Sequence, residues 1–459
     1  MSRAAPMDNH EGRADDVYEM QIGAAGPPHH HLASNETLSL PPVDGGRSAW
    51  LVLVTAFLTE MFLWGFPFSF GVLQSYYKTH LPISKSPGSI SAIGTTCTGI
   101  MYLAAPVMTA LMQQGPFFRR YCTFFGLALV VLAVGLSSLA EEVWHLVLTQ
   151  GVTYAVGCGL LYYPMLIYVD EWFIRRKSLA YGLMWAGTFT GGFLTPIVLD
   201  WGLNKYGAEK FLLVWAMALL TVIGPLLIFA KGRVPWQGTS RNWLRNCMAG
   251  HGFLRMPLFW IMQAVILIQS LGCFIPTLYL PEYASTVGFN AFQSSIMISI
   301  FNAIGAPGVL LSSLLCDHLG TSRVVVLCVA GMASAVFLFW GFSSATMLAP
   351  LLWIFAALYG FFYGAFTAVF SGTVQEIRRE APEGSADTGS LFGALMVARG
   401  VGNVASGPIS EALLRNQARV FGVLAYRSYY SPLVIYTGIM VTLSCTPLVM
   451  RQGRFVQHR

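Results

Sequence analysis

Two ionisable residues lie inside long apolar stretches, where a charged side chain is energetically costly and therefore indicates a function. Glu60 lies about 12 residues into the stretch 49–76, and Arg399 lies about 11 residues into the stretch 388–414. An arginine offers a planar fork of donors that suits a carboxylate or carbonyl group, and a buried glutamate can exchange a proton. The two residues therefore indicate binding of an acidic or carbonyl-rich molecule by Arg399 and proton exchange by Glu60.

The expected depth of these charges supports a shared role. A charge in hydrocarbon costs at least ~2.5–3.5 kcal/mol. If both stretches begin at the same membrane face, a helical rise places each charge roughly 16–18 Å deep, near the midplane. The alternatives are a structural ion pair between Glu60 and Arg399, or two charges that backbone groups and water satisfy separately.

Other polar side chains in the apolar stretches are weaker candidates for the same cavity. Buried tyrosines and amides often only bridge neighbouring helices. Three of them, Asn302, Tyr163 and Tyr363, are assigned here to substrate binding or coupling. The others are Tyr162, Gln263, Gln269 and Tyr359.

The composition predicts the solvent around these stretches. Of 459 residues, 55% are hydrophobic and 10% charged, and the mean hydropathy is +0.59. Soluble proteins carry roughly 25% charged residues, so a surface this poor in charge must largely face lipid. The net charge of +6 forms no basic stripe, which disfavours nucleic acid as a partner. The eight cysteines show no paired spacing, so we expect no disulfide framework, metal site or cofactor.

Apolar stretches long enough to cross a bilayer recur from Trp50 onward. A hydrocarbon core of about 30 Å needs ~20 apolar residues in a helix, and barrel strands are shorter and alternate in polarity. We therefore predict an all-α membrane protein with twelve transmembrane helices in two six-helix, pseudo-symmetric bundles. The predicted spans are 49–76, 89–112, 121–140, 143–168, 178–200, 211–230, 257–283, 291–316, 323–342, 347–373, 388–414 and 431–450.

Polar segments divide the chain into five regions. Residues 1–46 are rich in Pro, Gly, His and acidic residues, which predicts a disordered cytosolic tail. An N-terminal bundle over 47–230 and a C-terminal bundle over 257–450 flank a basic cytosolic loop over 231–256, and residues 451–459 form a second cytosolic tail. With both termini inside, sixteen Lys and Arg residues lie in inner connections and tails against seven outside, so the positive-inside rule favours this orientation.

Two loop motifs carry more specific information. The segment DHLGTSR runs from Asp317 through Gly320 to Arg323, and Asp317 is expected to accept hydrogen bonds at a helix N-terminus or to pair with an arginine, latching the inward gate. Its counterpart in the first half, at 113–120, has no acid. The segment EWFIRRKSLAYG at 171–182 places two arginines before small residues at helical spacing.

In that second motif, Arg175 and Arg176 are expected to anchor the cytosolic end of a helix. Gly182 and Ala186, with glycines in the next turns, are expected to permit close contact with another helix.

These motifs resemble the major facilitator superfamily and, within it, the fungal branch of monocarboxylate-porter-like carriers. Asp44-Gly45-Gly46 ahead of Trp50 is similar to the helix 1 signature of the same carriers, and the resemblance covers roughly residues 44–450. It implies a secondary transporter in which helix 1, with Glu60, lines a central cavity. It implies nothing about the substrate.

The chain departs from the animal monocarboxylate carriers at three positions. Those carriers have a lysine where this chain has Phe68, and an aspartate and an arginine where it has Gly305 and Val309. Because these residues carry proton and carboxylate binding in the animal members, lactate or pyruvate symport does not transfer to this chain.

We predict a secondary active transporter that moves a small organic acid or a partly apolar natural product, as an efflux carrier. The three departures and the aromatic, Met-rich helices favour export. One alternative is proton-coupled uptake of a monocarboxylate or vitamin-like nutrient, and another is a membrane nutrient sensor. No HExxH, GxSxG or Walker motif is present, so an enzyme is not expected. The expected partners are a small-molecule substrate, a proton and the lipid bilayer, with the protein a monomer in the plasma membrane.

Overall fold

The computed structural model describes most of the chain as helices. All described ranges fall within one compact unit, Pro41–Arg459, and contain no strand. Most of the predicted N-terminal tail, the centre of the basic loop and the C-terminal tail lie outside the described residues. The described residues are 42–80, 87–112, 115–233, 252–344, 348–381, 388–415 and 428–449.

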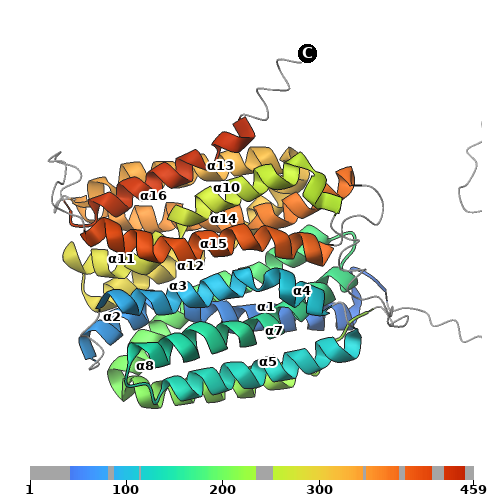
Figure 1. Cartoon of the computed structure of the whole chain (residues 1–459), viewed down its shortest axis with the longest axis horizontal. Coiled ribbons are helices and arrows are strands. Elements are labelled where there is room, and N and C mark those ends of the chain that lie inside the picture. The colour runs from blue at the N-terminus through green and yellow to red at the C-terminus, as the bar shows by residue number, and fades with distance from the viewer. Residues whose placement is uncertain are drawn as a thin grey trace, which may run out of the picture. The chain divides into compact units, whose positions relative to one another are not determined.

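The first group of helices runs from α1 to α8 (Figure 1). A π-helical turn, Val147–Thr153, joins α6 to α7. The helices are α1 (Gly46–Phe68), α2 (Phe70–His80), α3 (Pro87–Leu103), α4 (Ala105–Met112), α5 (Pro116–Ser137), α6 (Val143–Leu146), α7 (Tyr154–Trp172) and α8 (Lys177–Leu226).

The second group runs from α10 to α16. A π-helical segment, Ala335–Trp340, continues α13, and 3₁₀ turns lie at Gly252–Arg255 and Phe342–Ser344. The helices are α10 (Pro257–Cys273), α11 (Ile275–Thr286), α12 (Ala291–Leu319), α13 (Thr321–Ser334), α14 (Leu351–Glu380), α15 (Thr388–Arg415) and α16 (Ser431–Leu443).

The predicted twelve spans each have a helical counterpart among the described residues. In the described ranges, nine helical stretches are long and apolar enough to cross a membrane, and α3 with α4 makes a tenth that bends by 43°. The 50-residue α8 is too long for one crossing and turns at Gly207, whose φ of 79° glycine adopts readily, so it contains two spans. The remaining span is α15, whose hydropathy is lowered by its glycines, its serines and Arg399.

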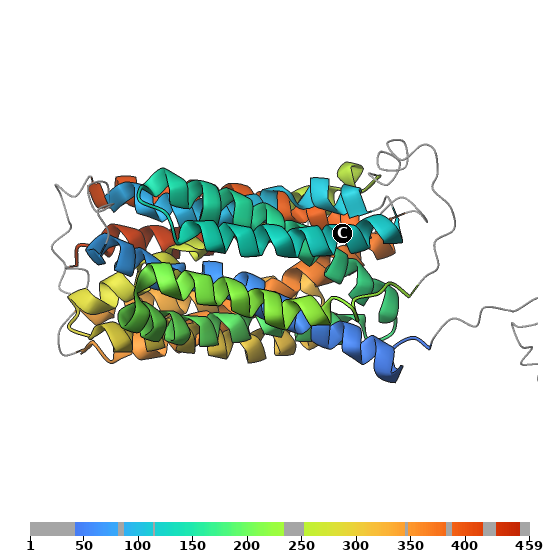
Figure 2. The same cartoon turned by 90° about the horizontal axis from the view of Figure 1, so that it is seen from below.

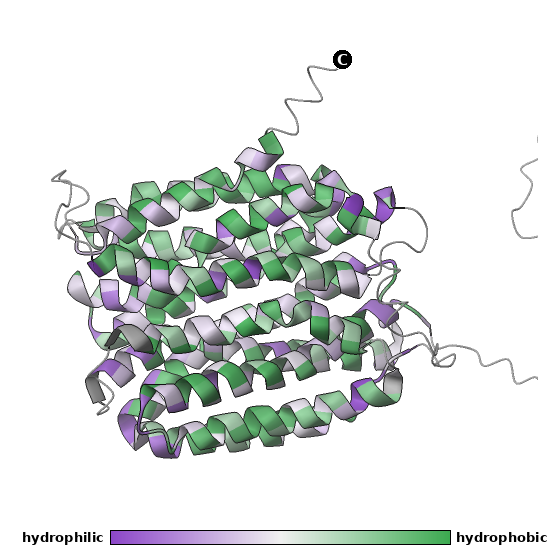
Figure 3. Ribbon diagram, viewed as in Figure 1, coloured by the Kyte–Doolittle hydropathy of each residue, from purple (hydrophilic) through white to green (hydrophobic). Residues whose placement is uncertain are grey.

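The two groups of helices lie side by side as two layers. In Figure 1 the blue-to-green helices lie below the yellow-to-red ones, and Figure 2 shows the same nearly parallel packing from below. The layers meet where α3 contacts α15 and where α8 contacts α12. Figure 3 shows hydrophilic residues gathered near the helix ends and apolar residues between them, as a bilayer requires.

Glycines in α8 bring it against α1 and α12. A Cβ at Gly191 would overlap the carbonyl oxygen of Met61, and one at Gly187 would overlap that of Phe57. A Cβ at Gly182 would lie 3.1 Å from Ser313 Oγ of α12. Ala186 is buried in the same helix. The small residues of α8 therefore let two helices approach closely, one in each layer.

Replacing Gly191 by alanine is expected to lower the thermal stability of the solubilised protein and its amount in the membrane. The added methyl has no space against the backbone of α1, and overpacking costs about 1–3 kcal/mol or more. Gly135→Ala in α5 is the matched control, since no atom lies within 4 Å of its Cβ position. Equal melting temperatures for the two variants would contradict this account of the α1–α8 contact.

Candidate substrate-binding site

Glu60 lies on the buried side of α1, beside α8. Its Oε2 accepts a hydrogen bond of 2.6 Å from Thr188 Oγ1, and its Oε1 has no hydrogen-bond partner among the described residues. The residue is 1% exposed. The absence of a side chain at Gly187 leaves room for Glu60 beside α8, because a Cβ at Gly187 would lie only 3.2 Å from Glu60 Cβ. A carboxylate oxygen is therefore held ready to accept one further hydrogen bond.

Arg399 lies on α15 among aromatic rings. Its Nη2 donates a hydrogen bond of 3.0 Å to the hydroxyl of Tyr363, while Nε and Nη1 have no partner among the described residues. The guanidinium carbon lies 5.4 Å from the ring centre of Tyr102 and 5.5 Å from that of Phe370. These rings stabilise a desolvated cation through its attraction to their faces. Arg399 thus keeps donors that no described group uses.

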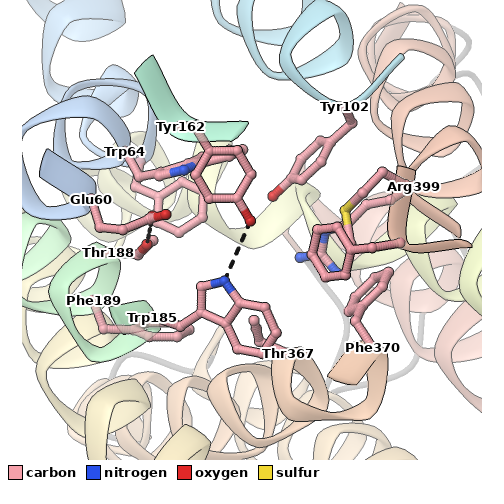
Figure 4. A pocket seen from close by; sticks show the side chains of 13 residues that line it. Glu60, Trp64, Tyr102, Tyr162, Trp185, Thr188, Phe189, Thr367, Phe370 and Arg399 are labelled. Atoms are coloured by element: carbon pink, nitrogen blue, oxygen red, sulfur yellow. Dashed lines mark hydrogen bonds between the residues drawn. The ribbon is translucent and has the colours of Figure 1, made fainter. Parts of the chain in front are cut away.

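Glu60 and Arg399 line one cavity between the two layers (Figure 4). The cavity has a volume of about 40 Å³, which is room for only a few water molecules. Eight of its lining side chains are aromatic, among them Trp64, Tyr102 and Trp185. No ion pair joins Glu60 to Arg399 in the described part of the chain. The structural-pair alternative therefore does not describe this arrangement.

Stacked rings cover the cavity from both layers. Trp185 of α8 stacks on Phe392 of α15 at 6.0 Å between ring centres, and on Tyr181 at 5.5 Å. Its indole Nε1 donates to the hydroxyl of Tyr162 at 3.4 Å. Because Trp185 and Phe392 belong to different layers, their contact must break if the layers separate on that side.

Of the weaker candidates, Tyr363 alone contacts one of the two charges. Asn302 donates to the Ile298 carbonyl at 3.0 Å within α12 and packs against Gly192. Tyr163 donates to the Met101 carbonyl at 3.1 Å and so joins α7 to α3. Neither Asn302 nor Tyr163 is among the residues that line the cavity.

Of the remaining candidates, one lines the cavity and three join neighbouring helices. Tyr162 lines the cavity. Gln263 donates to the Ala394 carbonyl at 2.8 Å, Gln269 to Met332 Sδ at 3.9 Å and Tyr359 to the Cys273 carbonyl at 3.4 Å. These last three bridge helices.

Several residues that line the cavity carry no signal in the sequence. Thr188, Trp64, Tyr102 and Phe370 are such residues, and all four lie in apolar stretches rich in similar side chains. Nothing in the sequence distinguishes an aromatic ring that faces a cavity from one that faces lipid. Phe68, which stands where the animal carriers have a lysine, also lines the cavity.

The segment before α1 caps the segment before α8. The carboxylate of Asp44 accepts hydrogen bonds from the backbone N–H groups of Ile174, Arg175 and Arg176 at 2.9–3.0 Å. Asp44 N–H in turn donates to the Trp172 carbonyl at 3.0 Å. The side chains of Arg175 and Arg176 are exposed. Asp44 and the three residues whose N–H groups it accepts from are 130 to 132 residues apart in the sequence, and they form one structural unit.

The charge of Asp44 is stabilised by these donors. Burial alone raises the pKa of Asp44, but the N–H groups of Arg175, Arg176 and Ile174 and the charge of Arg175 lower it below the usual 3.8. A carboxyl with a lowered pKa contributes stability above its unfolded-state pKa and loses it as the pH falls through the folded value.

Asp44→Ala is therefore expected to lower stability by roughly 0.5–2 kcal/mol at neutral pH, the usual cost of losing a helix cap. The deficit should shrink in thermal melts at about pH 3, where the wild-type carboxyl becomes protonated. Asp44→Asn keeps one accepting oxygen and should lose less. A deficit that is the same at both pH values would show that the charge of Asp44 does not act in this way.

Side-chain contacts also join the layers at this end of the molecule, called the basic end because Arg175 and Arg176 lie there. Ser178, in the first turn of α8, donates to Asp317 Oδ1 of α12 at 3.0 Å and accepts from Gln375 of α14 at 3.1 Å. Of the two expected roles, Asp317 thus has the hydrogen bond at a helix N-terminus, and no ion pair with an arginine appears in the described part.

The other residues of the two loop motifs lie at the same end of the molecule. Gly320 separates α12 from α13 with a φ of 81°, and the Arg323 side chain is exposed. In the first half, Arg119 pairs with Glu171 at 2.6 Å, although its own loop carries no acid. Residues 113–114 of that loop lie outside the described residues.

An ion pair joins the layers at the opposite end. Lys78 Nζ of α2 lies 3.0 Å from Glu282 Oε2 of α11. Together with the Ser178 contacts, this pair ties the two layers on both sides of the cavity. Contacts between the layers therefore lie toward both ends of the molecule, one on each side of the cavity.

Comparisons with known proteins agree with this architecture. The model of the Major Facilitator Superfamily matches residues 41–425. The MFS transporter asaE of Aspergillus flavus is 28% identical, with 87% of this chain and 86% of that protein covered. The Agnestins efflux protein AgnL12 of Paecilomyces divaricatus is 27% identical (83% and 86%), and the Aspyridones efflux protein apdF of Emericella nidulans is 25% identical (88% and 78%).

Solved structures share the fold at low sequence identity. The human organic anion transporter MFSD10 superimposes with a TM-score of 0.62 and 14% identity, covering 88% of this chain and 99% of that one. A bacterial homologue of the human lysosomal transporter Spinster, in an inward-facing and occupied conformation, gives 0.61 and 15% identity, with 90% and 98% covered. At such identities the likeness shows the fold alone.

Proposed function

The chain belongs to the major facilitator superfamily and is a multi-pass membrane transporter, and from this premise we propose that it is a secondary active exporter of a small organic acid or partly apolar natural product. The observation that carries the proposal is Arg399. A buried arginine with unpaired Nε and Nη1, set among aromatic rings, suits an acidic or carbonyl group attached to an apolar body.

The small volume of the cavity fits the transport cycle of such a carrier. At about 40 Å³ it is far smaller than the ~300–1,000 Å³ of ligand sites for drug-sized molecules. A substrate can enter only if the layers part at one end. The Ser178–Asp317 hydrogen bond at the basic end and the Lys78–Glu282 ion pair at the opposite end are the contacts that must open in turn.

Two features support export. The similar fungal proteins AgnL12 and apdF carry the names of efflux proteins for agnestins and for aspyridones. In this chain Phe68 makes the cavity more apolar than a lysine would, which favours a partly apolar cargo. We further propose that protonation of Glu60 couples this export to a proton gradient and that the protein acts as a monomer.

Export is tested in host cells that express the protein and are preloaded with radiolabelled benzoate, benzyl alcohol or benzylamine. Because Arg399 recognises an acid, expressing cells should lose benzoate faster than cells without the protein and lose the neutral and cationic probes at the background rate. Faster loss of benzylamine than of benzoate would contradict an acid-recognising cavity.

The orientation is proposed from the basic end. Arginines gather there, so we place that end and both termini in the cytosol. The plasma membrane is proposed as the location of the protein. In intact cells, a membrane-impermeant maleimide should label a cysteine at Lys205, near the turn of α8, and reach one at Arg175 only after permeabilisation. The reverse pattern would invert the topology.

A further inference from the structure

Glu60 and Arg399 both have side-chain atoms without a hydrogen-bond partner among the described residues, and when both groups are ionised these atoms need opposite kinds of partner. Oε1 of an ionised Glu60 accepts only, and the guanidinium nitrogens of Arg399 donate only. Both residues are at most 3% exposed. Figure 4 shows them on opposite sides of the cavity, and the rings of Tyr162, Tyr102 and Trp185 also line it.

Neither group satisfies the other, and water has little room. No ion pair joins them in the described part, and the cavity that both line has a volume of about 40 Å³. A buried charged atom without a partner is costly, so a ligand that supplies both partners gains at both ends of the cavity. The walls add a third requirement, because flat rings favour a flat, conjugated body.

From this geometry we infer that the substrate is a flat, conjugated molecule with two unlike ends: a carboxylate or acidic carbonyl that accepts from Arg399, and an N–H or O–H group that donates to Glu60 Oε1. This inference rests on the proposed function and narrows its substrate class. It also assigns Glu60 a direct contact with the substrate in addition to any exchange of protons.

Because Glu60 and Arg399 lie in different layers, a substrate that contacts both residues links the two layers. Glu60 belongs to α1 in one layer, and Arg399 belongs to α15 in the other. A molecule with both ends links the layers, whereas an acid without a donor leaves Glu60 Oε1 unpaired. Donor-bearing acids should therefore bind more tightly than the same acids without the donor.

The test compares ligands that differ only at the donor end. Binding to the purified full chain in lipid nanodiscs is measured by calorimetry for 4-hydroxybenzoate, benzoate and 4-methoxybenzoate, and for the longer pair 4-hydroxycinnamate and cinnamate. In at least one length series, the hydroxyl-bearing acid should bind about tenfold to hundredfold more tightly, as expected for a hydrogen bond to a charged group. The methoxy acid should bind no better than benzoate, because it cannot donate.

The same measurement on Glu60→Gln locates the donor contact. The amide oxygen accepts from Thr188, so an NH2 group faces the cavity in place of the accepting Oε1, and the ratio of hydroxyl-acid to plain-acid affinity should fall well below its wild-type value. Asp200→Asn makes the same chemical change outside the cavity and should keep the full advantage.

The outcomes separate this inference from the proposed function. Equal binding of hydroxylated and plain acids by the wild type in both series would overturn the two-ended substrate and leave export of acids intact. A hydroxyl advantage that persists in Glu60→Gln would also overturn it. If none of the carboxylates binds, both the inference and the proposed function are overturned.

Discussion

Arg399→Gln is expected to reduce benzoate exchange in proteoliposomes by at least about 100-fold while the protein still reaches the membrane. Among the described residues that line the cavity, Arg399 is the only one with a cationic side chain. Glutamine keeps one donor but removes the charge that compensates for desolvating a carboxylate. The initial rate of exchange of radiolabelled benzoate, normalised to the reconstituted protein, measures the effect.

Arg399→Lys is expected to reduce benzoate exchange less than Arg399→Gln does. Lysine keeps the charge and loses the planar fork, so an intermediate loss of about tenfold is expected. Lys210→Gln is the matched control, since it removes a positive charge from an exposed position of α8. Exchange at the wild-type rate in Arg399→Gln would remove Arg399 from substrate recognition.

Glu60→Gln is expected to abolish accumulation of benzoate against its gradient and to spare exchange. An amide cannot take up or release a proton, so the variant cannot couple the imposed pH gradient to transport. Benzoate has no donor for Glu60, so its exchange should continue near the wild-type rate. Accumulation equal to the wild type across the same pH gradient would exclude Glu60 from coupling.

The double variant Glu60→Gln with Arg399→Gln tests the structural-pair alternative. If the two residues only balanced each other, neutralising both should recover the activity and expression lost in each single variant. Because Glu60 is bound to Thr188 and Arg399 to Tyr363, with no ion pair between them, we expect no recovery.

Local composition determined much of this protein. The twelve spans follow from the lengths of the apolar stretches. Glu60 and Arg399 stand out because a charged side chain in hydrocarbon is costly and is rarely found there without a function. The small residues from Gly182 onward predicted close helix contact, and glycines of that run lie against α1 and α12. These inferences need only the residue types and their spacing along one helix.

Tertiary packing decided which faces meet. A helix that is apolar on every side carries no pattern that tells a cavity from lipid, so its rotation is set by its neighbours. Packing turned Asn302 and Tyr163 toward adjacent helices, brought Thr188 to Glu60, and placed Glu60 and Arg399 on one cavity without pairing them. It also joined Asp44 to the backbone before α8, because segments far apart in sequence become neighbours only when their helices pack side by side.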